Sequence, residues 1–159
     1  MNHSIKVGFS FGLTSGIITT LGLMVGLSSG TNLKIVVIGG IMTIAIADSF
    51  SDALGIHISE ESENKHTTKE IWQSTLSTFL FKFIITISFI APVLLFDDLS
   101  VAVIASIIWG MFILILLSYY MAKQQKIKPY KPVLEHILIA VAVILITHYV
   151  GCWIATTFS

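Results

Sequence analysis

Residues 99–121 read LSVAVIASIIWGMFILILLSYYM, and this stretch contains no charged side chain. An α-helix needs about twenty predominantly apolar residues to cross the roughly 30 Å hydrocarbon core of a bilayer, because each residue adds about 1.5 Å. The stretch satisfies this requirement in both length and composition. It therefore predicts a transmembrane helix over residues 99–121.

The composition of the whole chain indicates that other stretches also lie in a bilayer. Of its 159 residues, 55% are hydrophobic and 11% are charged, and the mean hydropathy is +0.90. Soluble domains carry about 25% charged residues. We predict an all-α polytopic membrane protein in which residues 1–159 form a single domain of five transmembrane helices. The predicted spans, separated by turns rich in Gly, Ser, Asp, Lys and Pro, are about 7–28, 35–57, 75–96, 99–121 and 133–156.

The charge balance and the motifs argue against several classes of function. Nine lysines balance nine acidic residues and there is no arginine, so no basic surface for nucleic acid is expected. No catalytic constellation or nucleotide-binding loop is present, and we expect neither an enzyme nor a bound cofactor. His3, His136 and His148 are expected to have interfacial or packing roles, and Cys152 is expected to be a small packing residue.

The lysines are unevenly distributed between the two predicted sides of the membrane. Lysine near the end of a span favours the cytoplasmic side. Only Lys34 falls on the side of the turns at residues 30–32 and 97–98. The opposite side carries Lys6, Lys65, Lys69, Lys123, Lys126, Lys128 and Lys131. We therefore predict that the N-terminus and the polar segments 58–74 and 122–132 are cytoplasmic. Lysine without arginine, together with abundant isoleucine, favours a prokaryotic plasma membrane.

Small residues recur every four positions in the first two predicted helices. Such stripes allow two helix backbones to approach closely. They predict tight packing of the first two helices, with each other or with a second copy of the chain. The stripes are Gly8, Gly12 and Gly16, then Gly22, Gly26 and Gly30, and in the second helix Ala47, Ser51 and Gly55.

Three ionisable residues fall inside predicted spans, where the bilayer penalises charge by at least a few kcal/mol. Asp48 and Asp52 lie one helical turn apart and share a face, and Lys82 is expected at a similar depth in the next helix. An ion pair between Asp52 and Lys82 would lock two helices together. Alternatively, both carboxylates serve as hard oxygen ligands for a divalent cation, or as a proton relay.

Further polar residues accompany this group. Ser15 and Thr19 in the first helix are expected at a similar height and His57 at the mouth of the site, as accessory or ion-pairing groups. The acidic segment that follows the second helix could gather cations at the cytoplasmic face, or could be a solvated connector. Its candidate residues are Glu60, Glu61, Glu63 and His66.

Several segments resemble the vacuolar iron transporter family. The first-helix sequence SGIITTLGLMVGL at residues 15–27 is similar to the first-helix signature of that family. The sequence SDALGIHIS at 51–59 resembles its small-residue segment in helix two, and APVLLF at 91–96 its proline-centred end of helix three. The short segment after helix two resembles the nodulin-like branch, which lacks a long cytoplasmic insert.

This resemblance implies a five-helix homodimer, joined through helices one and two, that exports Fe²⁺ or Mn²⁺ from the cytoplasm in exchange for protons. The family carries an aspartate where this chain has Ser15. Aligned on Gly55, Asp52 replaces the family methionine and Ile56 the family glutamate. Asp48 and Asp52 are therefore the predicted metal ligands. The rival interpretations are a non-transporting membrane scaffold of the same fold and a transporter of a different substrate.

Overall fold

The protein folds into helices only, over the residues 3–158 that its computed structural model describes. The predicted domain limits, 1 and 159, lie outside these residues. The helices are α1 (His3–Thr31), α2 (Lys34–Ser62), α3 (Thr68–Ser88), α4 (Ile90–Leu95), α5 (Leu99–Gln124) and α6 (Tyr130–Phe158). Within this range, α3 and α4 together form one candidate span, so five segments are long and apolar enough to cross a membrane. The predicted all-α class and its five spans are confirmed.

The interruption of the third span has a local cause. Pro92 lacks a backbone N–H, and its ring conflicts with the carbonyl of the residue four positions earlier, which is Ser88. α3 ends at Ser88, and α4 begins two residues later, after Phe89. The predicted span 75–96 therefore contains a break.

The helices extend beyond the predicted limits. α2 was predicted to end at residue 57 but continues to Ser62, and α3 begins at Thr68 rather than 75. A capping box fixes this start: the Glu70 N–H donates to Thr67 Oγ1 over 3.3 Å, and the Thr67 N–H donates to Glu70 Oε2 over 2.9 Å. The polar segment predicted at 58–74 is reduced to a connection over residues 63–67.

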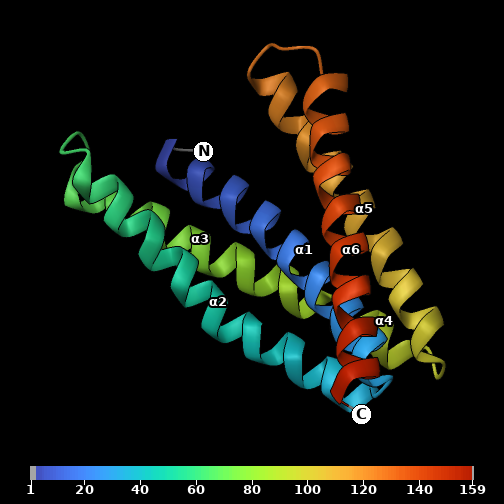
Figure 1. The fold of residues 1–159 in the computed structure, drawn as a ribbon. Coiled ribbons are helices and arrows are strands. Elements are labelled where there is room, and N and C mark those ends of the chain that lie inside the picture. Colours follow the sequence, from blue (N-terminus) through green and yellow to red (C-terminus); the bar gives the residue numbers. More distant parts are fainter. Residues whose placement is uncertain (1–2, 159) are drawn as a thin grey trace.

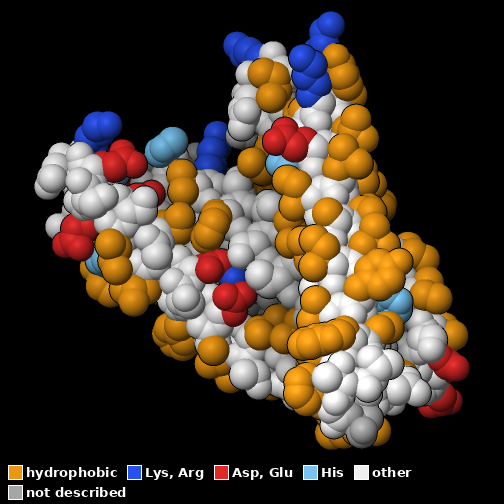
Figure 2. Space-filling view, in the orientation of Figure 1, with side chains coloured by type: hydrophobic (Ala, Val, Ile, Leu, Met, Phe, Trp, Pro, Cys, Tyr) orange, Lys and Arg blue, Asp and Glu red, His pale blue; other side chains and the backbone are white. Residues whose placement is uncertain are grey.

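α1 lies at the centre of the bundle, between the α2 and α3 pair and the α5 and α6 pair (Figure 1). Figure 1 also shows the two chain ends at opposite ends of the bundle. In Figure 2 most of the lysines gather at the end where the chain begins. The structure thus places the lysine-rich connections together at one end.

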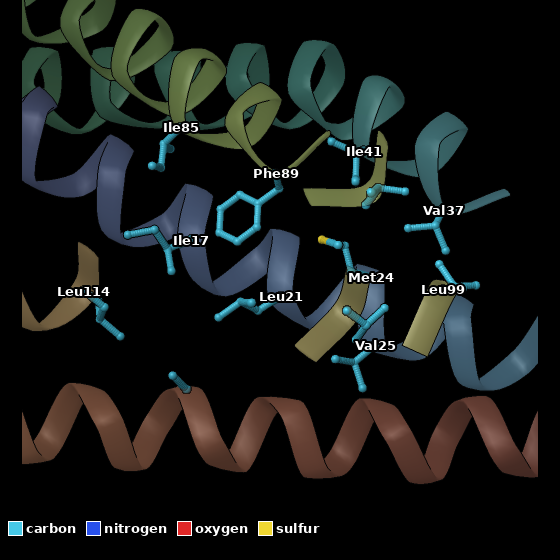
Figure 3. Close-up of a cluster of buried hydrophobic side chains, with 13 residues drawn as sticks. Ile17, Leu21, Met24, Val25, Val37, Ile41, Ile85, Phe89, Leu99 and Leu114 are labelled. Atoms are coloured by element: carbon cyan, nitrogen blue, oxygen red, sulfur yellow. The ribbon is translucent and has the colours of Figure 1, made fainter. Parts of the chain in front are cut away.

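The apolar core is built around α1. Its side chains Ile17, Leu21 and Met24 are almost fully buried, and they pack with Phe89, from the break between α3 and α4, and with Leu114 of α5 (Figure 3). The outward faces are also apolar, with Ile108 65% and Ile84 62% exposed. Apolar side chains on both the inside and the outside are typical of helices whose solvent is lipid.

The glycine stripes of α1 pack against helices other than the one predicted. A Cβ at Gly12 would lie 2.7 Å from the Thr78 carbonyl oxygen of α3. A Cβ at Gly22 would lie 2.8 Å from Val143 Cγ1 of α6. The prediction that these stripes pack on α2 was wrong, because α3 and α6 cover them.

Candidate functional site

The two carboxylates of α2 and the lysine of α3 form one cluster. Lys82 Nζ lies 2.6 Å from Asp48 Oδ2, and it also forms an ion pair with Asp52 Oδ2. Asp48 and Asp52 are four residues apart on one helix, so both can address the same point on a neighbouring helix. The Asp52 to Lys82 pair considered from the sequence is present, and Asp48 joins it.

Ser15 links this cluster to α1. Its hydroxyl donates to Asp52 Oδ2 over 2.6 Å and accepts from Lys82 Nζ over 3.0 Å. Three helices therefore meet through one hydrogen-bonded group. The resemblance to the vacuolar iron transporter family implies an aspartate at this position. Here Ser15 instead hydrogen-bonds both the Lys82 ammonium and the Asp52 carboxylate.

Close packing of α1 on α3 brings Ser15 and Lys82 together. A Cβ at Gly16 would lie 2.6 Å from Ile85 Cγ2 and 3.3 Å from Lys82 Cγ. The missing side chain at Gly16 thus leaves room for the aliphatic stem of the lysine. Glycine is required here for the close approach rather than for an unusual backbone angle.

Burial differs across the cluster. The Lys82 side chain is 1% exposed, whereas those of Asp52 and Asp48 are 19% and 30% exposed. The lysine is enclosed, and the carboxylates form the accessible side. Since two carboxylates surround one ammonium, the formal charge of the group is −1.

Asp48 opens onto a cavity of about 660 Å³ between α1, α2 and α6. The walls are mainly apolar, with hydroxyls from Thr19, Ser51 and Thr147. In Figure 2, acidic side chains flank a basic one near the middle of the visible face, over α2. The sequence did not predict the wall from α6, because residue spacing does not show which distant helix covers α1.

The other predicted accessory residues lie apart from the ion pairs. The Thr19 hydroxyl lines the cavity but donates to the Ser15 carbonyl over 2.9 Å. His57 Nδ1 is 2.9 Å from Thr75 Oγ1, and the ring packs edge-on against Trp72 at a centroid distance of 4.9 Å. His57 lines a separate apolar pocket of about 410 Å³ between α2 and α3.

The acidic residues predicted to follow the second helix lie in different environments. Glu60 is 7% exposed and accepts a hydrogen bond of 2.6 Å from Ser74 Oγ. Glu63 approaches Lys65 at 3.8 Å and His66 at 3.9 Å, at the surface. Glu61 is exposed. Among residues 3–158, no group of three or more His, Cys, Asp or Glu side chains is arranged to hold a metal ion.

Two histidines join helices through serine. His136 Nδ1 lies 2.7 Å from Ser118 Oγ, between α6 and α5. His148 Nδ1 lies 2.7 Å from Ser29 Oγ, between α6 and α1. Both contacts agree with the packing roles expected from the sequence.

The chemistry of the three-helix cluster follows from its charges. Both carboxylates direct Oδ2 to one ammonium, so Lys82 Nζ occupies the position of a cation shared by Asp48 and Asp52. Carboxylate and hydroxyl oxygens are hard ligands that suit divalent cations. The arrangement can hold an added cation through these carboxylates if the ammonium withdraws.

Comparison with known proteins finds a match over the helices that carry the serine and the two aspartates of this cluster. A family model described as the VIT family matches residues 9–73, which include Ser15, Asp48 and Asp52 but not Lys82. No curated protein matches the chain. The match spans most of α1, all of α2 and the start of α3. Residues 9–73 of this membrane protein are therefore similar to the VIT family.

Proposed function

We propose that this protein transports divalent cations of the Fe²⁺ and Mn²⁺ type, with Asp48 and Asp52 as the metal-binding carboxylates. The observation that carries the proposal is that both residues already share one cation, Lys82 Nζ, inside a candidate span. Charges within a bilayer are retained mainly where they have a partner or line a pathway. The surplus carboxylate leaves a charge that a metal ion or a proton would neutralise.

The cavity beside Asp48 supports access to this site. It is large enough for a hydrated cation, at about 660 Å³, and the hydroxyls of Thr19 and Ser51 lie on its wall. Oxygen ligands of this kind, with water, would complete the coordination of a hard cation. Lys82 must move aside for both carboxylates to bind the ion, so its displacement is part of the proposed transport step.

We infer the direction and coupling from the family resemblance together with the lysine distribution. The lysine-rich end would be cytoplasmic, and the cation would leave the cytoplasm in exchange for protons. The short connection at 63–67 supports the nodulin-like form without an insert. The whole chain would act as one transmembrane domain, in a prokaryotic plasma membrane. The VIT family consists of transporters, and a transport role involves no catalysed reaction or cofactor.

We also propose a homodimer in which α2 and the exposed part of α1 face the partner. The α2 stripe predicted from the sequence, Ala47, Ser51 and Gly55, is exposed within the protomer. A Cβ at Gly55 would meet no atom within 4 Å. The cavity next to this stripe is lined on one side by Ile18 and Leu23 of α1. A helix of a second copy could pack closely on this surface.

The double pairing of Lys82 also favours a second candidate function, a membrane scaffold in which the cluster only holds helices together. A buried ion pair commonly has a structural role, because removing one partner leaves an uncompensated charge. In that case the loss of Lys82 would destabilise the protein unless Asp48 and Asp52 were also neutralised. Transport of another substrate is the third alternative, since the family methionine and glutamate are replaced.

Cation flux into proteoliposomes separates these functions. Purified protein is reconstituted with a pH dye inside the vesicles, and the uptake of Fe²⁺, Mn²⁺ and Mg²⁺ is compared. The transporter predicts Fe²⁺ or Mn²⁺ flux with an opposite movement of protons, lost in Asp48→Asn and Asp52→Asn. Asp97→Asn is the matched control, because Asp97 lies in the exposed turn before α5 and its change should leave flux intact.

The stability of the same variants shows whether a loss of flux comes from the loss of a transport site or from the loss of the fold. Loss of flux in variants that keep the wild-type melting temperature and elution profile supports a transport site. Absence of flux for every ion from well-folded wild-type protein would overturn the transport proposal and favour the scaffold. Flux of an ion other than Fe²⁺ or Mn²⁺ would support the third alternative.

A further inference from the structure

A cavity of about 390 Å³ lies between the start of α1 and the end of α5. Both segments lie at the lysine-rich end of the bundle (Figure 1). This cavity is separate from the one beside Asp48, because the two share no lining residue. Its volume falls within the range of pockets that hold small molecules, about 300–1,000 Å³. The cavity is therefore large enough for a ligand, and the chemistry of its walls indicates which kind.

The walls of this cavity are rich in hydrogen-bond donors. Its polar lining residues are His3, Lys6, Ser10, Tyr120, Gln124 and Gln125. Ammonium, imidazole, amide and hydroxyl groups can all donate. No Asp or Glu of residues 3–158 lines the cavity. The Glu70 carboxylate, which interacts with His3, lies outside the lining and accepts hydrogen bonds from Thr67. The walls thus suit an anion whose oxygens accept hydrogen bonds.

Lys6 supplies the positive charge of the lining, and it is half-buried. The ion pairs among the described residues use Lys65, His66 and Lys82, and Lys6 takes part in none of them. A charge that is taken out of water is stabilised by a partner of opposite sign. An anion in the cavity would provide the counterion that the described carboxylates do not provide.

The cavity lies where α5 leaves its apolar region. The uncharged run 99–121 ends beside it, and a polar sequence follows. Tyr120 is 47% exposed, and exposed tyrosine is enriched where a bilayer meets water. Val7, Phe9 and Met121 give the cavity an apolar side, with the Phe9 ring edge-on to that of Tyr120 at a centroid distance of 6.4 Å. An anion that also carries an apolar portion matches both parts of the lining.

We propose that this cavity binds the phosphate headgroup of an anionic phospholipid. Lys6 pairs with the phosphate, and the side-chain amides of Gln124 and Gln125 donate to its oxygens. The acyl chains begin on the apolar side of the cavity, next to Phe9. Basic pockets between transmembrane helices are a recognised type of site for anionic headgroups on the cytoplasmic side. The bound lipid would bridge α1 and α5, and this role does not depend on transport.

A lipid titration tests the proposal. The full-length protein in detergent is titrated with phosphatidylglycerol or with phosphatidylcholine, and the lipid-bound fraction is measured by native mass spectrometry. The wild type should bind the anionic lipid more tightly than the zwitterionic one. Lys6→Gln should weaken the phosphatidylglycerol affinity about fivefold, the effect of one lysine beside an anionic membrane surface. Gln124→Ala/Gln125→Ala should also weaken it, and both glutamines are exposed, so this variant should keep the fold.

Lys69→Gln is the matched control, because Lys69 is an exposed lysine in the first turn of α3 and does not line the cavity. It should retain the wild-type affinity. Asp48→Asn/Asp52→Asn should also retain it, which keeps the result independent of the proposed transport site. Inorganic phosphate at the same concentration should not displace the lipid, and equal competition by it would overturn the assignment to a lipid. Equal affinity of the wild type for the two lipids, or undiminished phosphatidylglycerol affinity in the folded cavity variants, would overturn the proposal.

Discussion

Lys82 Nζ lies 2.6 Å from Asp48 Oδ2 and also pairs with Asp52, so one ammonium serves two carboxylates inside a candidate span. The loss of each of these three residues should therefore have a different effect on stability. Either aspartate can be lost while the lysine keeps a partner, whereas loss of the lysine leaves two adjacent carboxylates without a counterion. This asymmetry gives a stability prediction that does not depend on transport.

Lys82→Met should destabilise the protein by about 3 kcal/mol, the lower end of the range for breaking a buried pair. Asp48→Asn should have a smaller effect, because Asp52 still accepts from Lys82. The measurement is the free energy of unfolding in detergent. The triple variant Asp48→Asn/Asp52→Asn/Lys82→Met should recover much of the loss, because it contains no unpaired charge. An equal loss from all single variants would contradict this account.

The same lysine substitution should increase cation binding. If Lys82 Nζ occupies the shared cation position, its removal leaves both carboxylates available for a divalent ion. Mn²⁺ should then raise the melting temperature of Lys82→Met more than that of the wild type, since a ligand that binds the folded state stabilises it. Lys69→Met is the control, because Lys69 is exposed in the first turn of α3. No difference between the two lysine variants would refute the shared position.

Alanine substitutions should distinguish a glycine that is closely packed within the protomer from a glycine on its open surface. Gly12→Ala brings Cβ to 2.7 Å from the Thr78 carbonyl oxygen, and overpacking of this kind typically costs about 1–3 kcal/mol. Gly55→Ala should be neutral or slightly stabilising, because its Cβ meets nothing within 4 Å and alanine favours helix. Melting temperatures of the two variants test this, and a reversed order would contradict the packing of α1 on α3.

Bulky substitutions on the α2 stripe should weaken the proposed homodimer. Ala47→Leu would hold two backbones apart, because close helix packing in membranes needs small side chains. Ala142→Leu is the matched control, an exposed alanine on α6. Light scattering of the purified protein in detergent should show more monomer for Ala47→Leu only. A wild-type protein that is monomeric throughout would exclude the dimer.

The native cysteine reports the membrane orientation. With the lysine-rich end in the cytoplasm, a membrane-impermeant maleimide added to intact cells should label Cys152, which lies toward the other end of α6. In a Cys152→Ser background, Lys126→Cys should be labelled only after the cells are opened. Labelling in the opposite order would show an inverted orientation.

Much of the fold follows from hydrophobicity alone. The uncharged run at 99–121 and four other long, mainly apolar runs predict five spans, since the bilayer requires long apolar helices whatever their partners. The limits were less accurate, because capping and polar ends extend helices past their apolar part. The capping box at Thr67 and Glu70, which advances the start of α3 to Thr68, is such a case.

The candidate site, like the fold, could be predicted from the sequence only in part. The sequence by itself identified Asp48, Asp52 and Lys82, because charge in an apolar run is conspicuous and a spacing of four places the two carboxylates on one face. It did not determine that Lys82 pairs with both aspartates, that Ser15 joins the cluster from α1, that α6 lines the cavity, or that the glycines of α1 face α3 and α6. Helical periodicity specifies which residues share a face. Which neighbour covers that face depends on packing between helices distant in the chain, and only the tertiary structure decides it.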